Sequence, residues 1–345
     1  MPNIMLTYRC NLHCPYCFAN EFVNSSSTDI TLENFDKAIS YLTKQGPSRV
    51  GLIGGEPTLH PQFEDILLRI INNSMVSEAT IYTNGILLDK YIKLLVHPKF
   101  RILVNWNSPA DIGDKIFSRI RDNVDDLILN YHMKDRINIG VNLYGDGFDY
   151  SYVTELLQRY NLHRLRISIT APDFSRNTET DVLAYFRAHK AFLLRFFHDM
   201  DSIQVLPYYD CNKPPYCVWT DEERMWLESY VKKYPTQDSS LIGHKSFCFP
   251  VVDILPNLQA VRCFGMSDYL KVNIFDFESV TDIASYFLNY VDALAYKIPT
   301  DSKCLECYQC KIRHCTAGCI GFKASKITEG NQYCASLLMI DKAEV

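Results

Sequence analysis

The sequence predicts an α/β protein in which a parallel sheet covered by helices curls towards a partial (β/α)6 barrel, followed by a small cysteine-rich domain. Short apolar segments alternate with amphipathic segments over residues 1–207, and from Pro207 onwards the chain becomes richer in Pro, Cys and aromatic residues. Repeated strand–helix units with apolar strands indicate a parallel sheet, and right-handed crossovers curl such a sheet towards a barrel. We therefore expect a barrel over 1–207, a bridging region over 208–247 and a cysteine-rich domain over 248–345.

The expected strands and helices alternate along the barrel region. Thr31 is the candidate cap of the first helix, because a Thr side chain can accept a hydrogen bond from a free N–H group of the first turn. Six strand–helix units fit a (β/α)6 barrel, in which functional groups lie at the C-terminal ends of the strands. The expected strands are 4–7, 50–53, 79–82, 102–107, 137–143, 165–169 and 203–206, and the expected helices are 31–43, 62–73, 87–96, 111–130, 151–160 and 180–199.

Composition excludes several classes of protein. The 345 residues are 47% hydrophobic, which is ample for a core, and the net charge of -5 provides no basic stripe for nucleic acid. No run of eighteen apolar residues predicts a membrane span, and 1–6 lacks the basic region and apolar core of a secretory signal. We therefore expect a soluble cytoplasmic protein. Its thirteen cysteines are gathered in groups, which in a reducing compartment indicates metal binding.

The first cysteine group is Cys10, Cys14 and Cys17, spaced four and then three positions apart. Cluster irons are held by thiolates, and a 4Fe-4S cube normally takes four, so three closely spaced cysteines leave one iron open for a substrate or cofactor. One alternative is a zinc site that also uses His13, although His13 directly precedes Cys14 and the two neighbours would coordinate one ion awkwardly. A disulfide-bonded turn is the other alternative.

Two further motifs follow strand-like segments. Val50 to Ile53 leads into Gly54-Gly55-Glu56-Pro57, where a glycine pair lets the backbone approach a ligand beside a carboxylate. Alone, this motif is also compatible with an ordinary strand-to-helix turn. Ile81 to Gly85 is a strand that ends in Asn84, and an Asn-Gly turn of no chemical role is its alternative interpretation.

The pattern Cys-x3-Cys-x-aromatic-Cys, with Tyr16 as the aromatic residue, resembles the signature of the radical S-adenosylmethionine (SAM) enzymes. The resemblance implies a partial barrel and a cluster, held by Cys10, Cys14 and Cys17, whose open iron binds SAM. The cluster would cleave SAM to methionine and a 5'-deoxyadenosyl radical that abstracts a substrate hydrogen.

The same resemblance implies the remaining SAM-site residues. Gly54, Gly55 and Glu56 would line the site of the SAM amino group, with Tyr16 and the strand end at Asn84 beside the cofactor. Arg166 lies on a predicted strand and would either meet the SAM carboxylate or form an ordinary ion pair. His13 and His60 flank the motifs.

The densest cysteine run lies near the C-terminus. It reads Cys304-x2-Cys307-x2-Cys310-x4-Cys315-x3-Cys319, with Cys334 fourteen residues further on. Paired Cys-x2-Cys elements also occur in zinc ribbons, so a structural zinc is the alternative. Beside a radical SAM signature, the run resembles the SPASM or twitch type of extension, which binds auxiliary 4Fe-4S clusters. The resemblance assigns Cys307, Cys310, Cys315 and Cys334 to an outer cluster, and Cys248, Cys263 and Cys319 to an inner one.

Three departures from the SPASM pattern affect these assignments. Leu258 stands where the family has a glycine, so we expect a different turn, and the Cys-x3-Cys gap is one residue shorter than usual. The fourth ligand of the inner cluster is Cys211, Cys217 or neither. Cys304 is surplus unless it replaces an assigned ligand.

The segment from Asp210 to Cys217 follows a predicted strand, which places it at the barrel mouth. Cys211 and Cys217 there would ligate iron, donate a hydrogen atom to a substrate radical, or simply pack, since cysteine is often buried without a chemical role. Asp210, Asp146 and Tyr144 are candidates for acid–base or hydrogen-bonding roles, and solvated loop residues are the alternative.

The resemblance implies an oxidoreductase or maturase that needs a low-potential electron donor, such as flavodoxin or ferredoxin. The first expected substrate is a ribosomally made peptide that receives a cross-link, a thioether or an epimerised centre. The second is a sugar or aminocyclitol acted on by a small-molecule dehydrogenase or epimerase. A non-catalytic zinc or cluster-binding module is the hypothesis from another class. Because an exposed three-thiolate cube is degraded by oxygen, we expect activity only under anaerobic handling.

Overall fold

The computed structural model describes residues 1–14, 16–17, 23–24, 28–145, 147–170, 182–235, 241–242, 248–266, 270–293, 296 and 301–321. The chain divides into two compact units. The first comprises Met1–Val141, Asp149–Leu162 and Val251–Ala284, and the second comprises Asn142–Phe148, His163–Pro250 and Ser285–Val345. The domain boundaries expected from composition stay predictions.

Parallel strands form the centre of the first unit, to which β5 contributes its residues up to Val141. In space their order is β1, β2, β3, β4 and β5, and each pairs in parallel with the next. Their bounds are β1 (Asn3–Met5), β2 (Ser48–Ile53), β3 (Val76–Thr83), β4 (Phe100–Asn105) and β5 (Ile137–Leu143). Because the register aligns Met5 with Ile53, the loops after β1 and β2 leave the sheet at the same edge.

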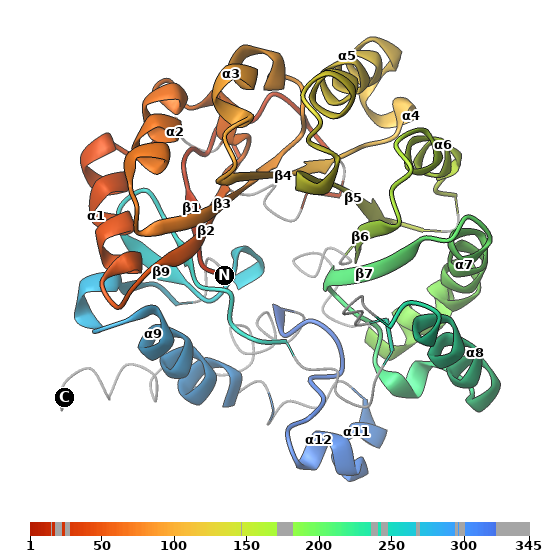
Figure 1. The fold of residues 1–345 in the computed structure, drawn as a ribbon. Helices are drawn as coiled ribbons and strands as arrows, with labels where there is room; N and C mark the ends of the chain where they lie inside the picture. The colour runs from red at the N-terminus through yellow and green to blue at the C-terminus, as the bar shows by residue number, and fades with distance from the viewer. Residues whose placement is uncertain are drawn as a thin grey trace, which may run out of the picture. The chain divides into compact units, whose positions relative to one another are not determined.

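Helices follow each of these strands in the sequence, and Figure 1 shows α1, α2 and α3 along one face of β1 to β4. The Thr31 hydroxyl accepts a hydrogen bond from the Asn34 N–H group, which confirms the predicted cap. The helices are α1 (Leu32–Thr43), α2 (Phe63–Asn72), α3 (Ile92–Leu95), α4 (Pro109–Ile112), α5 (Asp114–Asp125) and α6 (Ser151–Arg159), with 3-10 turns at Pro57–Leu59, Leu88–Tyr91 and Lys134–Arg136 and a π-helical turn at Asp126–Asn130.

Three short strands, which the sequence analysis did not identify, extend this sheet beyond β1. They are β8 (Asp253–Ile254), β9 (Gln259–Val261) and β10 (Val272–Asn273). The β8 strand pairs in parallel with β1, and β9 and β10 continue the sheet in antiparallel pairs. The 3-10 turns Phe264–Met266 and Ile274–Asp276 and the helix α9 (Val280–Tyr286) follow.

Leu258 occupies the turn between β8 and β9 with a φ of 66°. This left-handed conformation is the one that glycine adopts most readily. The backbone therefore has the geometry that a glycine would favour at this position, although a leucine supplies it. The expectation that this turn differs from that of the family stays a prediction.

In the second unit, β6 (Arg164–Ile169) pairs in parallel with β7 (Leu206–Cys211). The helices α7 (Val182–Ser202) and α8 (Asp221–Lys232) lie beside β7 in Figure 1. The rest of the described unit contains the 3-10 turn Tyr216–Val218, the π-helical segment Phe287–Asp292 and the short helices α11 (Ser302–Glu306) and α12 (Tyr308–Lys311).

The predicted α/β fold with a parallel sheet is confirmed, with two local corrections. The strand expected over 203–206 is wrong: α7 continues to Ser202, Gln204 makes a left-handed turn (φ 59°), and the strand is Leu206–Cys211. The helix expected over 111–130 is interrupted at Gly113, whose φ of 80° separates α4 from α5. No helix in the described part of the chain is long and apolar enough to cross a lipid bilayer.

Candidate active site

The loop that follows β1 carries Cys10, Cys14 and Cys17, and all three side chains are partly buried. The Cys10 thiol interacts electrostatically with the other two, so the three sulfurs belong to one group. Burial raises the pKa of Cys10 to about 11 and also raises the pKa of Cys14. A raised pKa means that forming the buried thiolate costs free energy. Coordination to a cluster iron would offset that free energy, because iron binds the thiolate form.

Hydrogen-bond donors already point at two of these sulfurs. The Leu12 N–H group donates to Cys10 Sγ at 3.4 Å, and the Asn107 side-chain amide donates to Cys14 Sγ at 2.9 Å. Donors of this kind stabilise thiolate sulfur, so the residues present suit an iron–sulfur cluster. Among the described residues, no group of three or more His, Cys, Asp or Glu side chains is arranged around a single metal ion.

Asn107 was not identified as a site residue from the sequence. It lies just beyond β4 and is 7% exposed. A polar residue after a parallel strand, at the edge of the sheet where Cys10 follows β1, was the available signal. The partner of that amide could not be predicted, because 93 positions separate Asn107 from Cys14.

The glycine pair after β2 packs against the backbone that leads into the cysteine loop. The Gly55 N–H group donates to the Thr7 carbonyl at 2.8 Å, and the Glu56 N–H group donates to the Arg9 carbonyl at 2.7 Å. A Cβ atom at Gly54 would lie 2.7 Å from the Thr7 oxygen, and one at Gly55 would lie 2.4 Å from the Arg9 oxygen. Glycine is therefore required at both positions because the backbone at Thr7 and Arg9 lies so close. This requirement holds whether or not a ligand also binds there.

The Glu56 carboxyl group is fully buried at the junction of three motifs. One oxygen accepts hydrogen bonds from the Thr58 N–H group, the Thr58 hydroxyl and the Thr83 hydroxyl, and the other accepts from the Asn84 N–H group at 2.7 Å. Burial raises the pKa of Glu56, whereas these four bonds favour its charged form. The oxygen bonded only to Asn84 retains capacity to accept a further donor.

Asn84 connects the end of β3 to the cysteine loop. Its side-chain amide donates to the Asn11 side chain at 2.8 Å, and its side-chain oxygen accepts from the Ile86 N–H group. Gly85 follows with a φ of 83°, so the segment is the Asn-Gly turn of the alternative interpretation and also contacts the loop. Tyr16 lies in the same loop and is partly buried.

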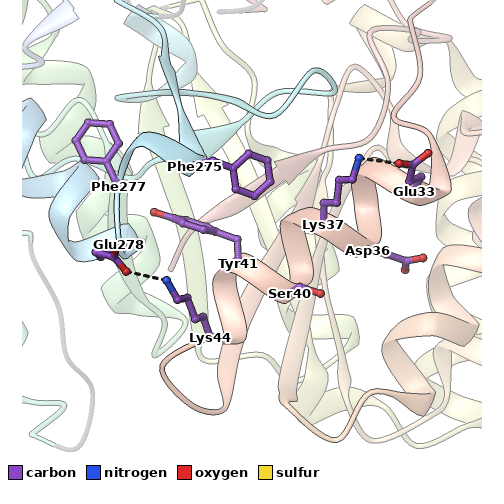
Figure 2. A pocket seen from close by; sticks show the side chains of 9 residues that line it. All are labelled: Glu33, Asp36, Lys37, Ser40, Tyr41, Lys44, Phe275, Phe277 and Glu278. Carbon is purple, nitrogen blue, oxygen red and sulfur yellow. Dashed lines mark hydrogen bonds and ion pairs between the residues drawn. The ribbon is translucent and has the colours of Figure 1, made fainter.

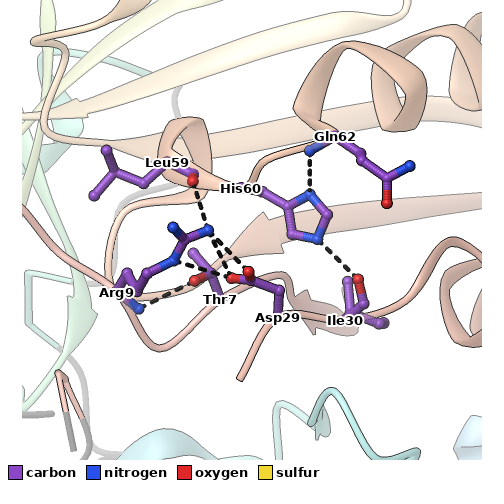
Figure 3. A network of polar contacts seen from close by, with 7 residues as sticks. All are labelled: Thr7, Arg9, Asp29, Ile30, Leu59, His60 and Gln62. Atoms are coloured by element: carbon purple, nitrogen blue, oxygen red, sulfur yellow. Dashed lines mark hydrogen bonds and ion pairs between the residues drawn. The ribbon is translucent and has the colours of Figure 1, made fainter. Parts of the chain in front are cut away.

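A polar network fixes both ends of the cysteine loop (Figure 3). The Arg9 guanidinium donates to both carboxylate oxygens of Asp29 and to the Leu59 carbonyl. Nearby, His60 accepts from the Gln62 N–H group through Nδ1, so its Nε2 carries the proton that bonds the Ile30 carbonyl. The segments before and after the loop are thereby held to the segment that follows Glu56.

Arg166, on β6, forms an ion pair with Asp210, which lies near the end of β7. Its guanidinium donates to the Asp210 carboxylate at 2.9 and 3.1 Å and to the Asn142 side chain at 3.2 Å. The ordinary ion pair, one of the two alternatives, is therefore the arrangement present. Tyr144 packs against Phe148, and Asp146 lies outside the described residues.

Cys211 is the last residue of β7, so it lies on the strand and not in the loop after it. A hydrogen bond links its thiol to the thiol of Cys319, and this bond is the main cause of the lowered pKa of Cys211. A strand-end cysteine thus meets the last cysteine of the C-terminal run that the structure describes. The sequence had left Cys211 as one of three alternatives for the fourth position of the cluster assigned to Cys319, and spacing did not decide among them.

The other C-terminal thiols gather around Cys310. Its thiol is hydrogen-bonded to those of Cys304 and Cys315, and these interactions raise its pKa. Cys217, in the turn Tyr216–Val218, interacts electrostatically with Cys315, Cys304 and Cys307. Cys248 and Cys263 are partly buried and belong to different units, and Cys334 lies outside the described residues.

A pocket of about 500 Å³ lies elsewhere in the first unit, beside α1 (Figure 2). Four of its lining charges pair with one another, Lys37 with Glu33 and Lys44 with Glu278. None of the motif residues lines it. This pocket therefore has no connection with the cysteine site.

Comparison with known proteins agrees with this geometry. Residues 4–137, which contain the cysteine loop, the glycine pair and Asn84, match the model of the radical SAM superfamily. Over these residues the chain is similar to the radical SAM superfamily. A probable GTP 3',8-cyclase of Methanococcus aeolicus is 32% identical over 94 residues, which is 27% of this chain and 31% of that protein. A GTP 3',8-cyclase of Limosilactobacillus fermentum is 36% identical over 95 residues, 27% of this chain and 28% of that protein. The chain spans less than a third of the length of the curated relatives it matches.

Solved structures resemble the chain over almost its whole length. One is native anSMEcpe with bound AdoMet, with a TM-score of 0.66 at 17% identity, covering 98% of this chain and 94% of that one. Another is SuiB of Streptococcus suis bound to S-adenosylmethionine, with a TM-score of 0.59 at 14% identity, covering 96% and 74%. At these identities the similarity shows the fold alone. The described C-terminal region is rich in cysteine as expected.

Proposed function

We propose that this protein is a radical SAM enzyme that reductively cleaves S-adenosylmethionine and abstracts a hydrogen atom from its substrate. The observation that carries the proposal is the group of three thiols after β1, which lies beside the glycine pair after β2 and is joined through Asn11 to Asn84 after β3. Three motifs far apart in the sequence meet at one edge of a parallel sheet, which is where such folds bind their substrates.

Cys10, Cys14 and Cys17 would hold the cluster, with the Leu12 and Asn107 donors on its sulfurs. When bound, such a 4Fe-4S cluster would supply the low-potential electron for cleavage of SAM to methionine and a 5'-deoxyadenosyl radical, which would abstract a substrate hydrogen.

The chain's own residues would orient SAM. The Glu56 oxygen that accepts only from Asn84 could also accept a hydrogen bond from the SAM ammonium group. The other oxygen holds the carboxylate in place through Thr58 and Thr83. Gly54 and Gly55 keep the backbone beside it free of side-chain bulk, while Tyr16 lies in the loop that carries the thiols. The rigid network at Arg9 and Asp29 would keep the loop in one geometry.

Auxiliary clusters in the cysteine-rich region would pass electrons or bind substrate, and a flavodoxin or ferredoxin would supply the electrons. The thiol contact between Cys211 and Cys319 supports Cys211 as the fourth ligand of the inner cluster, with Cys248 and Cys263. Cys211 is then a ligand, and the hydrogen-donor and packing roles no longer apply to it.

A ribosomally made peptide is the proposed substrate. The support is the full-length likeness to folds whose structures include native anSMEcpe with a Cp18Cys peptide and SuiB with the precursor peptide SuiA. The similarity to the GTP 3',8-cyclases covers only about a quarter of this chain. It therefore gives less support to a nucleotide substrate than the full-length likeness gives to a peptide.

Peptide modification is tested by co-expressing the chain with each short reading frame that flanks its gene, under anaerobic conditions in D2O, and measuring peptide masses. A cross-link or thioether removes two hydrogens, and epimerisation exchanges one carbon-bound hydrogen for deuterium. Either change should disappear in Cys14→Ala and persist in Ser40→Ala, an exposed position on α1. Unchanged peptides, together with a labelled sugar or aminocyclitol product, would favour the small-molecule enzyme instead.

A further inference from the structure

The C-terminal cysteine run contains one more thiol than the SPASM resemblance uses. Cys304, Cys307 and Cys310 have the spacing Cys-x2-Cys-x2-Cys, and Cys315 follows after four residues. The bacterial ferredoxin run has the same first two gaps; its first three cysteines bind one cluster, and its fourth cysteine, after three residues, binds the other cluster in two-cluster ferredoxins. The spacing alone therefore suits a cluster that includes Cys304.

The backbone folds this run so that its thiols converge. Cys304 lies on α11 and Cys310 on α12, and Cys307 separates the two helices with an extended conformation (φ -64°, ψ 122°). The Cys310 thiol is hydrogen-bonded to the thiols of both Cys304 and Cys315. Cys304 is thus a direct neighbour of Cys310, which is already assigned to the outer cluster and also contacts Cys315. A surplus cysteine need not have such a neighbour.

Cys315 has the surroundings of a cluster ligand, because its side chain is buried and a peptide N–H group donates to its sulfur. It is 9% exposed, and the Ala317 N–H group donates to its sulfur at 3.3 Å. Ala317 makes that approach with a left-handed φ of 57°. A peptide N–H group aimed at a buried sulfur stabilises the thiolate form, and such bonds help to set cluster potentials.

We propose that Cys304, Cys307, Cys310 and Cys315 form the complete ligand set of one auxiliary 4Fe-4S cluster, so that Cys334 is not required. The inference rests on the proposed function and changes its ligand assignment. A cube takes one thiolate on each iron, and these four cysteines lie within twelve consecutive residues. Cys217 then lies beside the cluster as a fifth thiol.

The assignment also accounts for the number of cysteines. Three thiols serve the SAM cluster, four serve this cluster, and Cys211, Cys248, Cys263 and Cys319 serve the inner one. Of the thirteen cysteines in the chain, Cys217 and Cys334 remain outside all three sets.

Cys304→Ser and Cys334→Ser form a matched pair of variants for the test. Each full-length protein is purified without oxygen, reconstituted with iron and sulfide, and analysed for iron, acid-labile sulfide and Mössbauer spectrum. Cys304→Ser should lose about four irons per chain relative to the unaltered protein, and Cys334→Ser should lose none. A full iron content in Cys304→Ser, or the loss of a cluster in Cys334→Ser, would overturn the proposal.

Two controls separate ligation from folding and from the proposed function. Cys304→Asp retains a ligand atom, so it should recover a cluster with an altered electron paramagnetic resonance signal. No recovery in a variant with unaltered far-ultraviolet circular dichroism would count against ligation. If the unaltered protein bound zinc and no iron, the proposed function itself would fail; a full set of irons that is insensitive to Cys304 would overturn only this inference.

Discussion

The side-chain amide of Asn107 donates a hydrogen bond to the sulfur of Cys14 over 2.9 Å. The contact joins the end of β4 to the cysteine loop, and both residues belong to the first unit. An N–H donor on a ligand sulfur stabilises the more negative, reduced cluster relative to the oxidised one. Asn107 is therefore placed to raise the reduction potential of a cluster held by this loop.

Asn107→Leu should lower that potential. If the bond contributes about 1.4 kcal/mol more to the reduced form, the shift is about 60 mV for a one-electron couple. Redox titration followed by electron paramagnetic resonance would measure it, with Asn138→Leu on β5 as the control. An unchanged potential in Asn107→Leu would show that the amide has no influence on the cluster.

Glu56→Gln should destabilise the cluster-free chain. The substituted amide would place an NH2 group against the donors that now bond the carboxylate, leaving buried polar groups unpaired at a cost of about 1–3 kcal/mol. Urea unfolding measures the change, and Glu64→Gln at an exposed position of α2 should shift the unfolding free energy by less than about 0.5 kcal/mol. Equal stability of the two variants would contradict the role given to the Glu56 hydrogen bonds.

His60 should make the cluster-free chain less stable in acid. Burial is the main cause that lowers the pKa of His60 in the folded state, and the charge of Arg9 lowers it further. The Ile30 carbonyl and the charge of Asp29 raise this pKa, but they do not cancel the shift. The unfolded chain therefore binds a proton more readily, and stability is lost as the pH falls below about 6.5, by up to about 1.4 kcal/mol per pH unit. Unfolding at a series of pH values should show a steeper loss in the unaltered chain than in His60→Gln, and parallel curves would exclude His60 as the source.

Cys211→Ser should remove iron from the inner auxiliary cluster. The thiol contact between Cys211 and Cys319 supports their joint ligation, and serine is a poor replacement for thiolate sulfur. We expect the iron content to fall by up to about four per chain, with the SAM cluster retained. Iron analysis and Mössbauer spectroscopy would measure this, and a full iron content would assign Cys211 to packing or to hydrogen donation.

Local sequence patterns predicted most of the barrel strands and helices, because apolar periodicity and caps such as Thr31 are encoded by neighbouring residues. The two-residue strand Asp253–Ile254 was missed because so short a segment has no periodicity, and it exists only through its pairing with β1. The strand ending at Cys211 was displaced because α7 extends further than its apolar pattern indicates.

Some features of the candidate site could likewise be predicted from the sequence, and others could not. The cysteine loop, the glycine pair and Asn84 carry spacing that a sequence can reveal. The contacts of Asn107 with Cys14, and of Cys304 with Cys310 in the folded run, depend on how distant or adjoining segments pack. The conformation of Leu258 could not be predicted from its residue type, since leucine rarely adopts a positive φ.

Formation of 5'-deoxyadenosine from SAM and dithionite by the anaerobically reconstituted protein tests the central claim most directly. The account predicts about twelve irons per chain and 5'-deoxyadenosine formation that is lost in Cys14→Ala. Bound zinc with no 5'-deoxyadenosine would contradict it and would leave a non-catalytic metal-binding module.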